Sequence, residues 1–337
     1  MSASSSEDDS EQYEEQFKEP ELPSEEGAAT SPPTKRRTAD IWITYKGQQF
    51  KIPPLFQEKW TERNDHRTLL NDTLIEFYMR HWMVNDVYDN EARKNFHIFN
   101  TFFFSKLKLR FSQYFKDGPP RRSELGEHFN RCFQRVNPGA FLRKEILVVP
   151  IHLERPKHWF LALVHNPAGA IRRYKIKKRT ERENNPGVPL CQQINEYAEF
   201  EFDELAMECR IVIMDSLVHD QKYKTALNTA YNHAFDYIRL WLQMAASSLG
   251  EELMIGRVRR VICKKLPQQT NSVDCGIYML AFAEYFTWYN TEWTRQSTES
   301  LEYLLMEDQL KEMLDSLEPR MRLEKLLQRL KSPDKGN

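Results

Sequence analysis

Cys275 is the residue of this sequence best placed to act as a nucleophile. It follows the polar loop 268–274 and opens a nearly all-apolar segment that continues to Phe286. Such a segment predicts a buried helix, and the free N–H groups and positive dipole end of a helix's first turn stabilise a thiolate. An inert core cysteine fits the same pattern, because free cysteine is among the most buried residue types. This segment alone leaves both interpretations open.

Three other polar residues could complete the chemistry of a cysteine nucleophile. His158 opens one predicted strand and Asp215 closes another. A thiolate needs a base such as histidine, and the histidine needs a carboxylate or amide that fixes its tautomer. Gln269, six residues before Cys275, can offer its side-chain amide to a developing oxyanion, beside the Cys275 backbone N–H. Each has a structural alternative, namely a strand-end histidine, a helix-capping aspartate and a loop glutamine.

The composition indicates a folded protein of one large or two small domains. The chain has 337 residues, of which 40% are hydrophobic, and no apolar run reaches the length of a membrane span. Its five cysteines are widely spaced and form no C-x-x-C pair, which argues against a disulfide framework or a zinc finger and favours a reducing compartment. The acidic, polar N-terminus argues against a signal peptide.

The charge is distributed unevenly along the chain. Residues 1–40 hold 11 acidic and 4 basic residues, which leaves 38 acidic and 44 basic residues, a charge of +6, in residues 41–337. Residues 1–39 contain almost no branched apolar side chains and are predicted to form a disordered acidic tail. The tail ends in the short basic cluster 35–37, which fits a nuclear-import signal and a solvated linker equally well.

The elements that must position the polar residues follow from the hydrophobic pattern. A hairpin is predicted over 41–52, followed by a helix with Leu74 and Trp82 on its apolar face, capped by Asp72 or Thr73; Thr73 and Glu76 have capping-box spacing. Further strands and helices are expected at 145–151, 158–164 (antiparallel to the preceding strand), 209–214, 257–262 (an edge strand), 124–133, 221–249 and 298–331. The order of helices, a few strands and more helices indicates the α+β class.

Residues 165–206 are interpreted as an insertion. Within them, residues 172–182 contain seven basic residues and one acidic residue. A solvated loop is the more ordinary explanation of such a run, and a patch for acidic partners or nucleic acid is the alternative.

Three short blocks resemble the catalytic blocks of the SUMO-specific (sentrin-specific, Ulp-type) cysteine proteases. They are Lys157-His158-Trp159, Met214-Asp215-Ser216-Leu217 and the run from Gln269 through Asp274-Cys275-Gly276 to Tyr278, in that family's order. The segment from Leu70-Asn71-Asp72 to Phe77-Tyr78 is similar to the family's N-terminal helix signature. The resemblance covers about residues 40–295, and residues 296–337 are expected to be C-terminal amphipathic helices and a tail.

The resemblance implies a papain-like α+β fold, with a small mixed sheet and a central buried helix that carries the nucleophile. It implies cleavage after the C-terminal Gly-Gly of SUMO, in SUMO precursors, SUMO–lysine isopeptides or both. By this match His158 is the general base and acid, Asp215 orients it, Cys275 is the nucleophile and Gln269 is an oxyanion donor.

The resemblance also implies the site's surroundings. Trp159 is expected to form one wall of a narrow tunnel for the Gly-Gly tail, and Asn71 and Asp72 are expected to contact substrate. No metal and no cofactor are implied. The expected partners are SUMO and SUMO-conjugated proteins, without a membrane and without nucleic acid, in the nucleus or in both nucleus and cytoplasm.

This chain differs from many members of the family at one position of the helix signature, and two other functions fit the same blocks. Many family members have Trp just before the Leu-Asn-Asp of the helix signature, where this chain has Leu69 or Leu70, so the lid is expected to be looser. The block 96–107 and the long insertion resemble the branch that trims poly-SUMO chains. A protease for another ubiquitin-like modifier of the Nedd8 type would share the catalytic blocks, and a catalytically silent SUMO-binding scaffold is the alternative from another class.

Overall fold

The computed structural model describes residues 41–52, 69–87, 90–118, 121–133, 136–177, 197–201, 207–288, 323, 326, 327 and 329. Contacts between Cα atoms divide the chain into Met1–Ala39 and Asp40–Asn337, and every described residue belongs to the second unit. The predicted acidic tail and its basic cluster lie outside the described residues, as does most of the predicted C-terminal segment, and the domain boundaries stay predictions.

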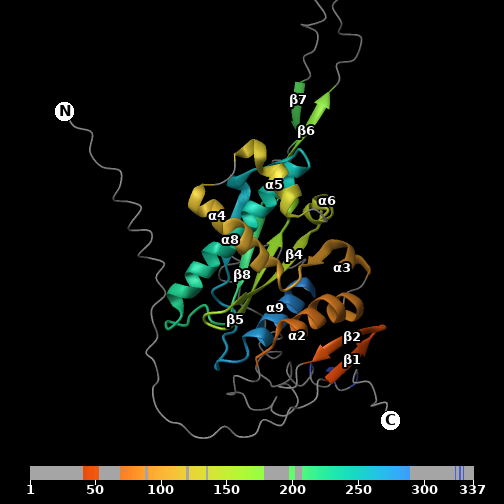
Figure 1. Cartoon of the computed structure of the whole chain (residues 1–337), viewed down its shortest axis with the longest axis vertical. Coiled ribbons are helices and arrows are strands. Elements are labelled where there is room, and N and C mark those ends of the chain that lie inside the picture. The colour runs from red at the N-terminus through yellow and green to blue at the C-terminus, as the bar shows by residue number, and fades with distance from the viewer. Residues whose placement is uncertain are drawn as a thin grey trace, which may run out of the picture. The chain divides into compact units, whose positions relative to one another are not determined.

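A mixed five-stranded sheet forms the centre of the described unit (Figure 1). Its strands, in spatial order, are β10 (Val258–Ile262), β8 (Cys209–Met214), β5 (His158–His165), β4 (Ile146–Leu153) and β3 (Phe96–Ile98). β4, β5 and β8 pair antiparallel, whereas the outer strands β10 and β3 each run parallel to their neighbour. The predicted antiparallel pair and the predicted edge strand are confirmed.

Side chains of the three central strands alternate between two hydrophobic cores, as the period of a β-strand requires. In β5, for example, Leu161 and Leu163 face one core, and Phe160 and Ala162 face the other. Both faces of the sheet are therefore covered, which explains why these strands read in the sequence as continuous apolar runs rather than as half-polar ones.

Helices on the two sides complete these cores. One core is formed with α4 (Phe103–Asp117), α5 (Leu125–Cys132), α6 (Pro138–Leu142) and α8 (Lys224–Ser248). The other is formed with α2 (Asp72–Glu76), the π-helix η3 (Phe77–Val87), α9 (Cys275–Trp288) and three C-terminal leucines, Leu323, Leu326 and Leu327. Figure 1 shows α4, α5 and α8 on one side of the strands and α2 and α9 on the other. The predicted α+β class is confirmed.

The remaining elements are short. They are the hairpin β1 (Ile41–Tyr45) and β2 (Gln48–Ile52), α3 (Asn90–Asn95), β6 (Ile171–Lys177), β7 (Tyr197–Glu201), β9 (Glu252–Leu253), and the 3-10 turns η4 (Arg122–Glu124), η5 (Pro167–Ala170) and η7 (Ile255–Arg257). The predicted hairpin over 41–52 is confirmed, and Lys46 and Gly47 at its tip both have positive φ, as a tight two-residue hairpin turn requires.

Two predictions of local structure are wrong. The α2 helix is capped by Asn71, whose extended backbone lets its Oδ1 accept from the Leu74 N–H, and not by Asp72 or Thr73. Glu76 does not close a capping box, because its Oε2 accepts from the backbone N–H of Thr101 instead. Tertiary packing has redirected this carboxylate.

The loop interpretation of the basic stretch is also wrong for its first part. Residues up to Lys177 form β6, which pairs antiparallel with β7 and at its base with β9. In the β6–β7 register the position of Arg173 lies opposite that of Glu201, and the position of Lys175 lies opposite that of Glu199. The basic run by itself does not reveal these acidic positions on the neighbouring strand. Residues 178–182 of the stretch lie outside the described residues.

Candidate active site

Strand pairing brings His158 and Asp215 together although 57 positions separate them in the chain. β5 and β8 are antiparallel, and Leu161 lies opposite Met214. The residue that follows β8 therefore comes close to the start of β5, two residues from being directly opposite His158. His158 Nε2 and Asp215 Oδ1 are 2.8 Å apart, and both side chains are at most 1% exposed.

The Asp215 carboxylate is held from several directions. Its Oδ1 also accepts from the backbone N–H of Leu217 at 2.7 Å, and its Oδ2 accepts from the hydroxyl of Tyr231 at 2.6 Å. Tyr231 comes from α8, and burial together with the adjacent carboxylate raises the pKa of its hydroxyl well above the ordinary value. A buried carboxylate with this many donors is fixed in place and remains a suitable partner for an imidazolium.

Cys275 is the first residue of α9 and is only 1% exposed. Burial would lower the pKa of His158, but hydrogen bonds to Asp215 and Cys275 and the negative charge on both partners raise it to about 10. Because Nε2 is engaged by Asp215, Nδ1 is the ring nitrogen left for the thiol. His158 thus lies between a carboxylate and a cysteine at a helix N-terminus, which is an arrangement that can hold an imidazolium and a thiolate together.

Gln269 belongs to the loop that leads into α9, and hydrogen bonds fix both ends of its side-chain amide. Its Oε1 accepts from the Ser216 hydroxyl at 2.6 Å, and its Nε2 donates to the Asn271 carbonyl at 2.6 Å. Its backbone N–H donates to the Ser216 carbonyl at 3.0 Å. The amide retains a second N–H that can serve an oxyanion.

The rest of this loop is ordered by its own polar side chains. Asn271 Oδ1 accepts the backbone N–H groups of Val273 and Asp274, both at 3.0 Å, and its Nδ2 donates to Asp274 Oδ2 at 2.6 Å. The Gln268 amide donates to the Asp215 carbonyl at 3.3 Å and so ties the loop to the end of β8. The polar loop 268–274 that precedes Cys275 is therefore held in a defined conformation by hydrogen bonds.

The three predicted substrate-binding residues lie around this centre. The Trp159 indole is buried, donates from Nε1 to the Leu70 carbonyl at 2.9 Å, and packs against the His152 ring with centroids 4.6 Å apart. The Oδ1 of Asn71 is already engaged as the α2 cap. Asp72 is half-buried; burial raises its pKa, and the nearby His152 opposes this shift. Their contacts with a substrate remain predictions.

Sequence reasoning missed Ser216 and Tyr231, which position the Gln269 amide and the Asp215 carboxylate. Ser216 carried one signal, because it directly follows Asp215 in a polar pair at the end of an apolar strand. Tyr231 carried none, since its role depends on how α8 packs over the sheet.

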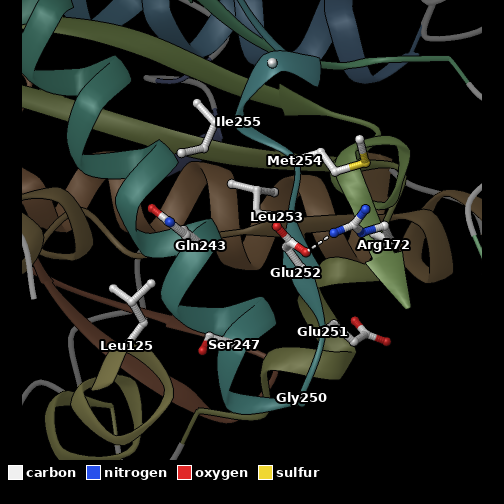
Figure 2. A pocket seen from close by; sticks show the side chains of 11 residues that line it. Leu125, Arg172, Gln243, Ser247, Gly250, Glu251, Glu252, Leu253, Met254 and Ile255 are labelled. Atoms are coloured by element: carbon white, nitrogen blue, oxygen red, sulfur yellow. Dashed lines mark hydrogen bonds and ion pairs between the residues drawn. The ribbon is translucent and has the colours of Figure 1, made fainter. Parts of the chain in front are cut away.

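A separate cavity of about 630 Å³ lies near the C-terminal end of α8 (Figure 2). Gln243 and Ser247 of α8, Arg172 of β6 and the segment 250–256 contribute to its lining, and Arg172 pairs with Glu252 there. Ser247 lies 16 residues beyond Tyr231 along the helix, a distance of about 24 Å at the rise of an α-helix. None of the residues proposed for chemistry lines this cavity.

The described residues contain no group of three or more His, Cys, Asp or Glu side chains placed to hold a metal ion. Among the described helices, none combines the length and the apolar character needed to cross a membrane.

Residues 68–324 match the family described as the Ulp1 protease family, C-terminal catalytic domain. The chain belongs to the Ulp1 protease family. The resemblance drawn from the short motifs is thereby confirmed.

Curated relatives match about two thirds of this Ulp1-family chain. Ubiquitin-like-specific protease 2 of Schizosaccharomyces pombe is 30% identical over 219 residues, which cover 64% of this chain and 30% of that protein. Human sentrin-specific protease 7 is 23% identical over 241 residues, covering 64% of this chain and 22% of that protein. The chain therefore spans less than a third of the length of these relatives.

A solved structure described as a crystal structure of the de-sumoylating protease superposes with a TM-score of 0.52 at 15% identity, over 87% of this Ulp1-family chain and 91% of that chain. At this identity the likeness shows the fold. The predicted Ulp-type α+β fold is confirmed.

Proposed function

We propose that this chain is a SUMO-specific cysteine protease in which Cys275 is the nucleophile, His158 the general base and acid, Asp215 its orienter and Gln269 an oxyanion donor. The observation that carries the proposal is the buried His158 ring, hydrogen-bonded to Asp215 at 2.8 Å and with its pKa raised by both Asp215 and Cys275, in a chain of the Ulp1 family. A nucleophile, its base, an orienting carboxylate and an oxyanion donor are the groups that acyl transfer needs, and a catalytically silent scaffold would have no need to keep all four.

The reaction follows from these roles. The Cys275 thiolate attacks the carbonyl carbon of the modifier's last glycine, and the oxygen that becomes negative is met by the Gln269 N–H and the Cys275 backbone N–H. The tetrahedral intermediate collapses as His158 gives its proton to the departing amine, which leaves a thioester on Cys275. A water molecule, deprotonated by His158, then attacks the thioester and releases the carboxylate and the thiol.

The substrates we propose are SUMO precursors and SUMO–lysine conjugates, with a preference for poly-SUMO chains. Specificity for a ubiquitin-like modifier of the sentrin type is supported by similarity to ubiquitin-like-specific protease 2 and sentrin-specific protease 7. The preference for chains rests on the resemblance of the block 96–107 and of the long insertion. Trp159, with an indole locked to the Leu70 carbonyl, is suited to lie over an extended glycine backbone and exclude side chains. Asn71 and Asp72, which directly follow Leu70 in the chain, are proposed to contact the same tail.

The compartment we propose is the nucleus, or the nucleus and cytoplasm, with the basic cluster 35–37 as the import signal. Neither a membrane nor nucleic acid is part of the proposed function. Replacing the three basic residues by alanine in a fluorescently tagged full chain should shift the protein toward the cytoplasm. An unchanged distribution would remove the cluster from the proposal.

The function is tested with modifier probes that carry a C-terminal electrophile. SUMO, Nedd8 and ubiquitin probes are each offered to the wild type and to Cys275→Ser, and the covalent adduct is scored as a gel shift. We expect an adduct with SUMO that is lost in the variant, because only a thiolate at position 275 can be captured. His158→Ala should slow capture near neutral pH.

The other outcomes decide between the alternatives. An adduct with Nedd8 alone would keep the mechanism and change the modifier. No adduct with any of the three probes, from protein shown to be folded, would overturn the enzyme and favour a SUMO-binding scaffold. An adduct that persists in Cys275→Ser would move the nucleophile to another residue.

A further inference from the structure

We propose that Ser216 is a positioning residue for the oxyanion site: its hydroxyl holds the Gln269 side chain in the one amide orientation that leaves an N–H free for the reacting carbonyl. The inference rests on the proposed function and adds to it a residue that does not itself touch substrate. Its basis is the pair of hydrogen bonds at the two ends of the Gln269 amide.

The chemistry of the partners fixes which end of the amide is which. The Asn271 carbonyl can only accept, so the amide atom 2.6 Å from it must be the NH2 group. The amide oxygen then faces Ser216 at 2.6 Å, and the Ser216 hydroxyl must donate to it. A flipped amide would set two carbonyl oxygens against each other at Asn271.

Without Ser216 only the hydrogen bond from Nε2 to the Asn271 carbonyl would hold the side-chain amide in this orientation. The terminal torsion of a glutamine is broad and is fixed mainly by its hydrogen bonds. Ser216 is 1% exposed and Gln269 is 8% exposed, so an Oε1 deprived of its donor would be a buried, unsatisfied acceptor. Rotation of the amide to find another donor would carry the remaining N–H away from the reacting carbonyl.

Ser216 directly follows Asp215 in the chain, so neighbouring residues hold His158 and Gln269. Asp215 and Ser216 are consecutive residues after β8; the first holds His158, and the second holds Gln269 through its hydroxyl and through its carbonyl, which accepts the Gln269 backbone N–H at 3.0 Å. The end of one strand therefore positions both the proton-transfer group and the oxyanion donor. Loss of the Ser216 hydroxyl should act through Gln269 and not through the thiol.

The test is a double-mutant cycle on kcat and KM, measured with SUMO, Nedd8 and ubiquitin that carry a fluorogenic amide at the C-terminus. Removal of a single oxyanion donor lowers kcat by about 10²–10³-fold, which is the loss we expect for Gln269→Ala. Ser216→Ala keeps the Gln269 amide but removes the hydroxyl that orients it. We therefore expect a loss of about 10-fold in kcat with a smaller change in KM. In the Gln269→Ala background, Ser216→Ala should have no further effect.

Two further measurements separate positioning from a structural defect. The rate of alkylation of Cys275 by iodoacetamide should be the same in Ser216→Ala as in the wild type, because His158 and Asp215 are untouched. Ser248→Ala, which removes a part-buried hydroxyl bonded to Ala245 near the C-terminal end of α8, should leave kcat unchanged. If Ser216→Ala fails to fold, Ser216→Cys, which keeps a weak donor of similar size, replaces it and should show a smaller loss.

The outcomes that overturn the inference differ from those that overturn the function. Full kcat in Ser216→Ala, or losses that multiply with those of Gln269→Ala, would show that Ser216 does not act through the amide. A wild type that hydrolyses none of the three substrates would overturn the proposed function and this inference with it.

Discussion

His158 is the residue whose surroundings set the pH behaviour of the site. Burial by itself would favour the neutral ring, yet Asp215 and Cys275 raise its pKa to about 10. Its ordinary value is 6.5, so the folded protein keeps this ring protonated over a pH range in which the unfolded chain does not. Protonation at this position is therefore coupled to folding.

The raised pKa of His158 predicts that the free energy of unfolding depends on pH. A raised folded-state pKa contributes stability that is fully present below pH 6.5 and is lost as the pH rises toward about 10. Relative to His158→Gln, the free energy of unfolding of the wild type should therefore fall across this window, by at most about 1.4 kcal/mol per pH unit. Denaturant unfolding at several pH values in the window measures the difference.

His97→Gln is the matched control for this titration. Burial and the nearby Arg80 and Lys144 lower the pKa of His97 to about 4, so its ring is neutral throughout the window. The difference between wild type and His97→Gln should be flat with pH. A difference for His158→Gln that is equally flat would show that His158 is neutral in the folded protein.

At the scale of elements, α9 meets the start of α2 at a glycine. A Cβ on Gly276 would lie 2.9 Å from the Cβ of Leu70, so the first turn of α9 can approach the helix signature closely only without a side chain there. Leu69 and Leu70 lie where the resemblance to the family leads us to expect Trp. In this chain Leu70 packs against Gly276, and its carbonyl accepts from Trp159.

We expect Gly276→Ala to lower the free energy of unfolding by about 1–3 kcal/mol, because the added methyl group overpacks a buried contact. Gly256→Ala is the control: a Cβ there meets nothing within 4 Å and the backbone has no positive φ, so it should be neutral or slightly stabilising. In a Leu70→Gly background, which removes the Cβ, Cγ and Cδ1 atoms that the new methyl group would meet, the penalty of Gly276→Ala should shrink. An undiminished penalty would place its cause elsewhere in the first turn of α9.

At the scale of the whole molecule, leucines of the far C-terminal region contribute to the core that contains Cys275. Leu323, Leu326 and Leu327 are buried in the same hydrophobic cluster as Phe282 and Phe286 of α9. The side of the sheet on which Cys275 lies is thus completed by residues nearly 50 positions further along the chain.

Deletion of residues 296–337 should therefore destabilise the protein. Each buried leucine side chain contributes about 1.5–3 kcal/mol, so the loss should be about 4 kcal/mol or more, measured by denaturant unfolding. Deletion of residues 331–337 alone keeps all three leucines and should leave stability unchanged. Equal stability of the two shortened chains would mean that the leucine contacts add nothing to the core.

The sequence by itself determined the elements and the chemistry they carry. Periods of two and of 3.6 residues are local properties, so the strands at 145–151, 158–164 and 209–214 and the buried helix at Cys275 could be read directly. The short blocks around His158, Asp215 and Cys275 also carry the resemblance to the family, because sequence motifs are local. The structure brings His158, Asp215 and Cys275 together at the ends of these elements.

Only the tertiary structure decided how these residues are held. The Ser216–Gln269 and Tyr231–Asp215 hydrogen bonds join elements that approach one another through sheet register and helix packing, and no local period encodes either. Glu76 left its predicted capping role for the same reason, because Thr101, 25 positions away, offered its carboxylate a backbone N–H. Hydrogen-bond partners are chosen by proximity in space, and proximity is settled only when the whole chain has packed.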